Sequence, residues 1–154
     1  MRVLSFDPGS KFLGWAFFKN NKLIDSGCEK FKDNYDGKKA LLIYGFLLSK
    51  ASEYLPDHIV CEHYFFNTNN RNATLVIPEV KGIMRLVAAT LGLELDEMHI
   101  GTVKKAVTGK GNSNKKQVSA AVAQLFNIEA SRHDEFDAVA VGYTFIKSYE
   151  GESK

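Results

Sequence analysis

The sequence lacks several features that would define its class at once. It has two cysteines, Cys28 and Cys61, which lie far apart and form no CxxC pair. This excludes a common zinc pattern and a disulfide framework, and it fits the reducing cytoplasm. No apolar run approaches the ~20 residues of a membrane helix, and the N-terminal MRVLSFDPGS has no signal-peptide core, so we expect no membrane association. Repeats and linkers are also missing, so residues 1–154 are expected to form one domain.

A large excess of charge of one sign is missing too. The chain has 20 Lys and Arg against 18 Asp and Glu, a net charge of +2, with 45% hydrophobic and 25% charged residues. These are ordinary values for a globular protein and exclude a disordered or fibrous chain. The chain is not a polycation, so any nucleic-acid site must come from local clustering of charge.

Turn residues and hydrophobic periodicity divide the chain into strands and helices. RVLSF, LGWAFF and KLIDSG are apolar runs separated by turn residues, and Asn20-Asn21 predicts a hairpin between the second and third. HIVCE predicts a buried strand. The remaining predicted elements are helices over residues 38–55, 74–91, 102–107, 114–126 and 133–147 and a strand over residues 93–98.

The order of these elements predicts an α/β fold built on a mixed five-stranded sheet flanked by helices. The first three strands are of hairpin type and antiparallel, while the two later strands should run parallel to the first. Sites in such sheets form beyond the carboxyl ends of the parallel strands. Asp7 ends the first strand and Glu62 ends the fourth, so both are expected at one edge. Gly14, seven residues after Asp7, could allow a close backbone approach there.

Four carboxylates could form a site for hard cations at this edge. Asp134 and Asp137 are three residues apart on a predicted helix and share one face, and they would join Asp7 and Glu62. Oxygen ligands suit Mg²⁺, and two such ions about 4 Å apart can activate water for phosphodiester cleavage. Each acid also has a simpler interpretation. Asp7 can initiate the DPGS turn, Glu62 can be an exposed strand-end residue, and Asp134 fits a capping box with Ser131.

Positive charge gathers between residues 101 and 128, a stretch with five lysines and no acid. The lysines are Lys104, Lys105, Lys110, Lys115 and Lys116. Ser113 can cap the helix that follows, and the helix N-terminus would also attract phosphate. The P-loop pattern GxxxxGK[ST] does not occur here. The stretch predicts a phosphate-binding surface, and the alternative is a solvated loop and helix face.

Three aromatic residues, Tyr64, Phe65 and Phe66, follow Glu62 closely and precede a polar loop. Aromatic side chains at such a place can pack in the core. Phe65 could instead stack on an unpaired base beside a catalytic carboxylate.

These pieces, in this order, resemble the RuvC family of Holliday-junction resolvases within the ribonuclease-H-like superfamily. The resemblance runs from residue 3 to about residue 144, with FDPGSKFLGWA, VCEHYFF, VKKAVTGKGNSNKKQV and DEFDAVAVG as its strongest stretches. A related pre-ribosomal RNA-processing nuclease family shares much of the first stretch, whereas the glycine- and lysine-rich third stretch is more specific to the resolvases. The short form resembles a phage-borne member, which would act in the cytoplasm of a bacterial host.

The resemblance implies a metal-dependent, structure-selective DNA endonuclease that resolves Holliday junctions and other branched DNA. Paired nicks would leave 5′-phosphate and 3′-hydroxyl ends. The implied cofactors are two Mg²⁺ ions per active site, with Mn²⁺ able to substitute, and the implied assembly is a homodimer. A helicase partner cannot be named. The alternatives are an RNA-processing nuclease on the same fold and a catalytically inactive junction-binding module.

The resemblance also assigns roles to particular residues. Asp7, Glu62, Asp134 and Asp137 correspond to the catalytic, metal-binding acids, and Phe65 corresponds to the base-stacking aromatic. Lys104 and Lys115 correspond to lysines at the scissile region, and we assign the catalytic role to Lys115. Lys104, Lys105, Lys110 and Lys116 are expected to bind DNA, although the adjacent lysines leave the register open.

The predicted helix over residues 74–91 departs from the family pattern. The family commonly has Gly-Gln-Ala-Arg-Gly where this chain has Pro78-Glu79-Val80-Lys81-Gly82. The helix is expected to contribute the dimer interface through some of Ile77, Val80, Met84, Val87 and Leu91. The alternative is that these residues fill the core of the monomer.

Overall fold

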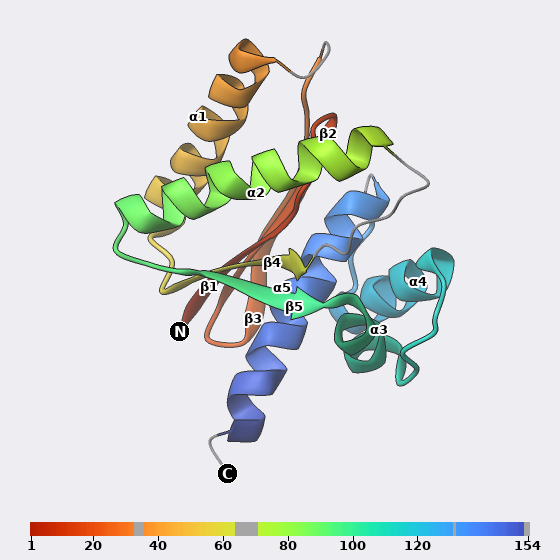
Figure 1. Ribbon diagram of the computed structural model, residues 1–154. Coiled ribbons are helices and arrows are strands. Elements are labelled where there is room, and N and C mark those ends of the chain that lie inside the picture. Colours follow the sequence, from red (N-terminus) through yellow and green to blue (C-terminus); the bar gives the residue numbers. More distant parts are fainter. Residues whose placement is uncertain (33–35, 64–70, 131, 153–154) are drawn as a thin grey trace.

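The computed structural model describes residues 1–32, 36–63, 71–130 and 132–152 (Figure 1). Five strands form one sheet: β1 (Arg2–Asp7), β2 (Phe12–Lys19), β3 (Lys22–Lys30), β4 (His58–His63) and β5 (Leu95–His99). The strand order is β3-β2-β1-β4-β5, with β1 antiparallel to β2, β2 antiparallel to β3, and β4 parallel to both β1 and β5. The predicted mixed five-stranded sheet is therefore confirmed.

Helices cover both faces of this sheet (Figure 1). One face packs on α1 (Gly37–Tyr54) and α2 (Arg71–Thr90), and the other on α3 (Ile100–Thr108), α4 (Lys115–Phe126) and α5 (His133–Glu152). Alternate side chains of β1 supply the two cores, since Leu4 and Phe6 belong to the first and Val3 to the second. None of the helices in the described part of the chain has the length and apolar content of a membrane span.

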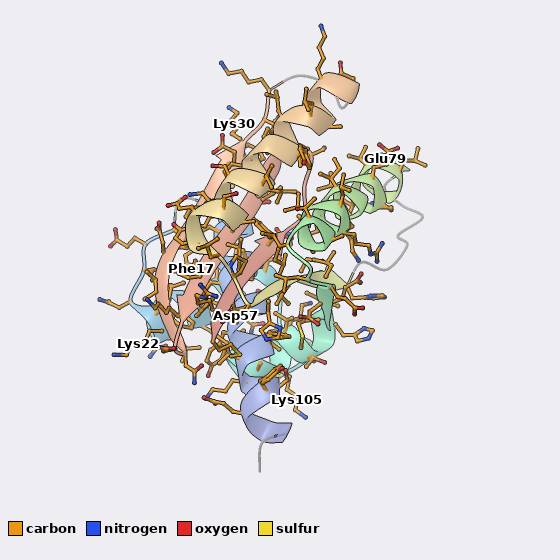
Figure 2. The ribbon with its side chains drawn as sticks, turned by 90° about the vertical axis from the view of Figure 1, so that its left-hand side faces the viewer. Phe17, Lys22, Lys30, Asp57, Glu79 and Lys105 are labelled. Atoms are coloured by element: carbon orange, nitrogen blue, oxygen red, sulfur yellow. The ribbon has the colours of Figure 1, made fainter. Side chains whose placement is uncertain are left out.

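The β2–β3 hairpin runs from Lys22 near its turn to Lys30 at its far end (Figure 2). Asn20 and Asn21 form the turn with φ angles of 51° and 64°. Asparagine tolerates this left-handed region, and two such residues give the strand twist that a tight hairpin needs. The hairpin predicted from this Asn pair is confirmed.

The helices α1, α2, α3 and α4 start one to three residues away from their predicted starts. The helix α2 begins at Arg71 rather than at residue 74 and contains Pro78. The helix α4 is capped by Asn114, whose side chain accepts from the backbone N–H of Gln117 in a capping box, so the cap assigned to Ser113 was wrong. The Ser113 hydroxyl is buried and donates to the carbonyl of Lys110 instead. Both serine and asparagine favour the cap position, so composition alone could not choose between these neighbours.

The face of α2 that was expected to form a dimer interface lies in the monomer core. Val80, Met84 and Val87 are 0%, 1% and 2% exposed, so the interface role was wrong for these three residues. Helical periodicity marks an apolar stripe but does not say whether the sheet or a partner covers it. A different stripe of α2 is exposed, with Leu75 and Leu86 at 68% and 56%.

The helix α5 lies very close to the sheet. A Cβ atom on Gly142 would come within 2.5 Å of the Ser5 Oγ and 2.6 Å of the Phe18 ring. The buried Ser5 hydroxyl lies 2.8 Å from the carbonyl oxygen of Ala138, to which it donates. These contacts fix the height of α5 above β1 and β2.

We expect Gly142→Ala to lower the free energy of unfolding by about 1–3 kcal/mol, because the added methyl group must displace Ser5 or Phe18. Gly45 in α1 is a matched control, since a Cβ there meets no atom within 4 Å. Gly45→Ala should be neutral or stabilising by up to about 1 kcal/mol, owing to the higher helix propensity of alanine. Urea unfolding measures both changes, and equal effects of the two variants would contradict the close docking.

Candidate active site

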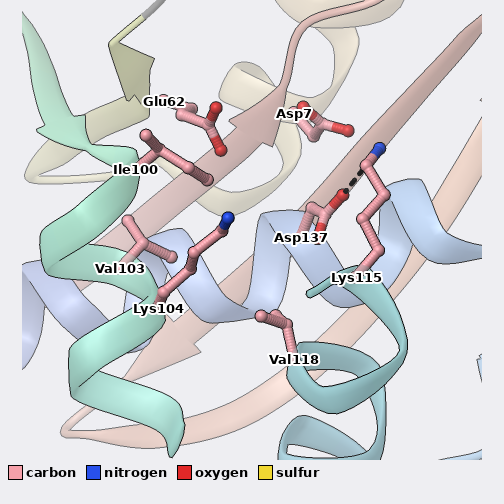
Figure 3. Close-up of a pocket in the computed structure, with 8 residues that line it drawn as sticks. All are labelled: Asp7, Glu62, Ile100, Val103, Lys104, Lys115, Val118 and Asp137. Atoms are coloured by element: carbon pink, nitrogen blue, oxygen red, sulfur yellow. Dashed lines mark ion pairs between the residues drawn. The ribbon is translucent and has the colours of Figure 1, made fainter. Parts of the chain in front are cut away.

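Two carboxylates meet at the edge where β1 and β4 end. The parallel register pairs Phe6 with Cys61, so Asp7 and Glu62 follow one residue later on neighbouring strands. Both side chains face a pocket of about 240 Å³, drawn in Figure 3. The residues that line this pocket are Asp7, Glu62, Ile100, Val103, Lys104, Lys115, Val118 and Asp137.

The first turns of α5 bring the other two acids to the same edge. Gly14 of β2 allows this approach, because a Cβ atom there would lie 1.8 Å from the carbonyl oxygen of Asp134. Asp137 lines the pocket with Asp7 and Glu62. Asp134 lines an adjoining groove of about 590 Å³, to which Asp7 also contributes. The structure thus brings all four predicted acids to one edge of the sheet, three in the pocket and the fourth in the groove.

Burial and like charge act together on these acids. Burial is the largest cause of the strongly raised pKa of Asp7, and the charges on Asp137 and Glu62 add to it. Burial and Asp137 raise the pKa of Glu62 to about 7. The pKa of Asp137 is raised as well, again mainly by burial, while Lys115 opposes the shift. The carboxylates therefore lie close enough to disfavour one another's charged forms.

Two lysines from different helices oppose this negative charge. Lys115, the first residue of α4, places its Nζ 3.9 Å from Oδ2 of Asp137 (Figure 3). Lys104 of α3 lines the same pocket, and its charge lowers the pKa of Glu62 as that of Lys115 does. Lys105 and Lys116, the neighbours that left the register open, are not among the residues that line this pocket. The geometry thus places Lys104 and Lys115, rather than their neighbours, at the pocket.

Comparison with known proteins identifies the family. A family model described as "Crossover junction endodeoxyribonuclease RuvC" matches residues 3–145. The crossover junction endodeoxyribonuclease RuvC of Alkaliphilus metalliredigens is 37% identical over 92% of this chain and 90% of that protein. Its counterpart from Trichlorobacter lovleyi is 34% identical over 97% of this chain and 87% of that protein. The chain belongs to the RuvC family.

Solved structures of resolvases share the fold of this RuvC-family chain. T. thermophilus RuvC in complex with Holliday junction substrate superposes with a TM-score of 0.86 at 21% identity, covering 99% of this chain and 97% of that one. The yeast mitochondrial Holliday junction resolvase Ydc2 gives a TM-score of 0.67 at 12% identity, covering 97% and 82%. The predicted ribonuclease-H-like architecture is confirmed.

The donor set of the RuvC-family pocket fits a hard divalent cation. Asp7, Glu62 and Asp137 offer carboxylate oxygens, which Mg²⁺ prefers. A bound cation would also offset the repulsion that raises their pKa values. Across residues 1–32, 36–63, 71–130 and 132–152, no group of three or more His, Cys, Asp or Glu residues has a geometry that could hold a metal ion. The match between this pocket and a divalent cation therefore rests on two facts: its donors are carboxylate oxygens, and the three acids line one pocket.

The residues next to Asp134 in sequence have partners of their own. The Nδ1 of His133 lies 2.8 Å from the Ser119 hydroxyl, and Glu135 accepts a 2.7 Å hydrogen bond from Ser26. The Nε of Arg132 donates to Oδ2 of Asp134 at 3.1 Å. Ser131, the predicted capping partner of Asp134, lies outside the described residues, and so does Phe65. The capping and base-stacking roles therefore stay predictions.

The apolar wall of the pocket escaped the sequence analysis. It consists of Ile100 and Val103 on α3 and Val118 on α4. Ile100 lies four residues before Lys104 and Val118 three residues after Lys115, spacings that place each on the same helical face as its lysine, whereas Val103 is the direct neighbour of Lys104. Apolar residues one turn from Lys104 and Lys115 were the available signal, but the same pattern also marks an ordinary core stripe.

Without metal, the free energy of unfolding should fall as the pH rises from about 4.5 to about 7 and level off above pH 7. Glu62 has a pKa of about 7 in the folded protein and an ordinary value of 4.5, so the folded state binds more protons between these values. The destabilisation by Glu62 is therefore absent below pH 4.5, grows between pH 4.5 and 7, and is complete above pH 7. Melting temperatures in EDTA should be lower at pH 8 than at pH 6, and Mg²⁺ should recover the loss.

Glu62→Gln should flatten this pH dependence, because the neutral amide carries no charge to bury. Glu129 is an exposed residue beyond the end of α4. The matched variant Glu129→Gln should show the same change of melting temperature with pH as the wild type. If the melting temperature of Glu62→Gln falls with pH as steeply as that of the wild type, burial of the Glu62 charge is not the cause of the pH dependence.

Proposed function

We propose that this chain is a metal-dependent, structure-selective endonuclease that resolves Holliday junctions and other branched DNA. One observation carries the proposal: carboxylates from β1, β4 and α5 converge on a pocket that also holds Lys104 and Lys115. Its relatives bear the name crossover junction endodeoxyribonuclease, and one structural neighbour was solved with a Holliday junction substrate. Since the relatives are bacterial, we place the activity in the cytoplasm, where bacterial DNA lies.

The acids would hold the metal cofactor. Asp7, Glu62 and Asp137 would bind two Mg²⁺ ions, with Asp134 completing the set from the adjoining groove and Mn²⁺ able to substitute. When bound, such ions activate a water molecule and stabilise the leaving oxygen, giving 5′-phosphate and 3′-hydroxyl ends. The protein would fix the carboxylates before substrate arrives, since they stand on strand ends and a docked helix.

The lysines and the apolar wall would act on the phosphodiester itself. Lys115 lies beside Asp137, where negative charge develops on the transferring phosphate, so it would stabilise the transition state. Lys104 would orient the phosphate from the opposite helix. Ile100, Val103 and Val118 would limit the access of bulk water, which strengthens these charge interactions.

A homodimer would present two such sites to a four-way junction. The exposed stripe of α2 includes Leu75, Gly82 and Leu86, spaced seven and four residues apart on one helical face. Among the described residues, no atom outside the neighbouring helix backbone lies within 4 Å of a Cβ built on Gly82, so a second helix could approach closely there. Pairing through this stripe about a two-fold axis would let each protomer cut one of two opposed strands.

The proposed activity is tested with Mg²⁺ and four substrates of matched sequence: a four-way junction, a three-way junction, linear duplex DNA and structured RNA. Paired nicks in the four-way junction at a rate well above that on linear duplex are expected. If linear duplex DNA is cleaved as fast as the junction, the enzyme is not structure-selective. If structured RNA is cleaved faster than junction DNA, the protein is an RNA-processing nuclease instead.

Asp7→Asn, Glu62→Gln and Asp137→Asn should each lower the cleavage rate by a factor on the order of 10³, because each removes a charged ligand while keeping the side-chain volume. Junction binding in Ca²⁺ should persist. Glu129→Gln, away from the pocket, should cleave at the wild-type rate. Turnover near wild type in any of the three pocket variants would show that the metal site lies elsewhere.

Lys115→Ala should lower the cleavage rate while affinity persists, because Lys115 acts on charge that develops in the transition state. Lys116 projects about 100° away around the helix, so Lys116→Ala should weaken binding without changing the rate of bound substrate. Binding in Ca²⁺ and single-turnover cleavage in Mg²⁺ separate the two effects. The reverse pattern would mean that the catalytic lysine is one residue further along.

Leu86→Glu should yield a folded monomer, because it places a charge on the exposed stripe of α2. Val87→Glu should unfold the chain, since Val87 is buried in the core beside it. Sedimentation and circular dichroism distinguish these outcomes. Leu125→Glu, on an exposed position of α4, is the control that should stay dimeric. A Leu86→Glu dimer would place the interface on another surface.

A further inference from the structure

Three cations surround one aromatic ring at the far end of the β2–β3 hairpin. The guanidinium carbon of Arg132 lies 3.5 Å from the centroid of the Phe12 ring. The Nζ atoms of Lys11 and Lys30 lie 5.9 Å and 6.0 Å from the same centroid. We call these four residues the Phe12 cluster. Neither the metal site nor the lysines of α3 and α4 accounts for it.

The fold holds the Phe12 cluster in place. Phe12 and Lys30 are direct cross-strand partners, so their side chains lie on the same face of the sheet. A 2.9 Å backbone hydrogen bond from Phe31 to the carbonyl of Lys11 ties the loop before β2 to the end of β3. Arg132 immediately precedes α5, whose start approaches β2 over Gly14. The cluster therefore joins three separate segments of the chain.

The Phe12 cluster opens onto the active-site groove. Lys11 and Phe12 line the groove of about 590 Å³ that also contains Asp7 and Asp134. Lys11, Lys30 and Arg132 are all exposed. The chain has a net charge of +2, so three cations around Phe12, a residue that lines the groove, form a notable local excess of positive charge. Their charge would offset the repulsion between DNA and the four acids.

The chemistry of the cluster favours phosphate over a base. Arg132 stacks on the face of Phe12, so this ring face supports a cation instead of a nucleobase. The guanidinium carries five N–H donors in a fixed fork, and its Nε donates to Asp134. The fork geometry lets one arginine contact a carboxylate and a phosphate at the same time. Lys11 and Lys30 add flexible point charges 5.9 Å and 6.0 Å from the ring centroid.

We propose that the Phe12 cluster binds the phosphodiester backbone of the DNA arm that enters the groove, and this inference rests on the proposed function. Lys104 and Lys115 line the pocket, Lys115 and Asp7 line both pocket and groove, and Lys11 lies at the groove. The positive residues thus follow one path past the acids. Phosphates on both sides of the scissile one are contacted along this path.

The hairpin itself offers a matched control. Lys19 and Lys22 pair across the opposite end of the same two strands, and both are exposed. Figure 2 shows Lys22 and Lys30 at opposite ends of the hairpin. The double variants Lys11→Ala/Lys30→Ala and Lys19→Ala/Lys22→Ala remove the same charge from the same element. Arg132 is left unchanged, because it contacts Asp134.

Binding to a four-way junction is measured in Ca²⁺ at several salt concentrations, with circular dichroism as a check on folding. Each lost phosphate contact lowers the slope of log affinity against log salt by about one. Lys11→Ala/Lys30→Ala should weaken binding several-fold and lower the slope by about two, whereas Lys19→Ala/Lys22→Ala should keep nearly the wild-type slope.

The outcomes separate this inference from the proposed function. If the wild type binds and cuts junctions but both double variants have the same slope, the Phe12 cluster does not bind DNA. If the wild type neither binds nor cuts junctions, the proposed function is wrong, and DNA is then not the ligand of the Phe12 cluster either.

Discussion

The close docking of α5 on β1 and β2 is the constraint on which the rest of the site depends. Asp7 and Glu62 stand on neighbouring strands, but Asp134 and Asp137 reach them only because α5 lies almost in contact with the sheet. Gly14 and Gly142 make room for this approach, and the Ser5 hydroxyl sets its register through the carbonyl of Ala138. Small side chains far apart in sequence thus determine whether the four acids form one site.

The same docking creates an electrostatic cost. Burial raises the pKa values of Asp7, Glu62 and Asp137, and the repulsion among the gathered acids adds to the effect. Lys104 and Lys115 offset part of this charge, and divalent cations would offset the remainder. The protein therefore holds its acids together through the packing of the fold rather than through their own attraction. Such preorganisation is what a site that stabilises a charged transition state requires.

Much of the fold and site could be predicted from the sequence, because the signals were local. Asn20-Asn21 predicted the hairpin, and the ends of two parallel strands predicted that Asp7 and Glu62 would meet. The errors arose where two physical explanations share one pattern. The apolar stripe of α2 with Val80 and Val87 suits a core as well as an interface, and adjacent residues could both cap α4.

Other features depend on contacts between distant segments, which a linear pattern does not contain. The apolar wall of the pocket and the stacking of Arg132 on Phe12 arise from the way α3, α4 and α5 pack around the sheet edge. No spacing rule connects Phe12 with Arg132, and only the docking of α5 brings them together.

We propose that the acids gathered at this sheet edge by β1, β4 and α5 form a two-metal site. Anomalous diffraction from crystals soaked in Mn²⁺ tests it most directly, since it locates the ions without relying on activity. We expect two peaks about 4 Å apart between Asp7, Glu62 and Asp137, with Asp134 turned toward one of them. Peaks elsewhere on the molecule, or none in this pocket at saturating Mn²⁺, would contradict it.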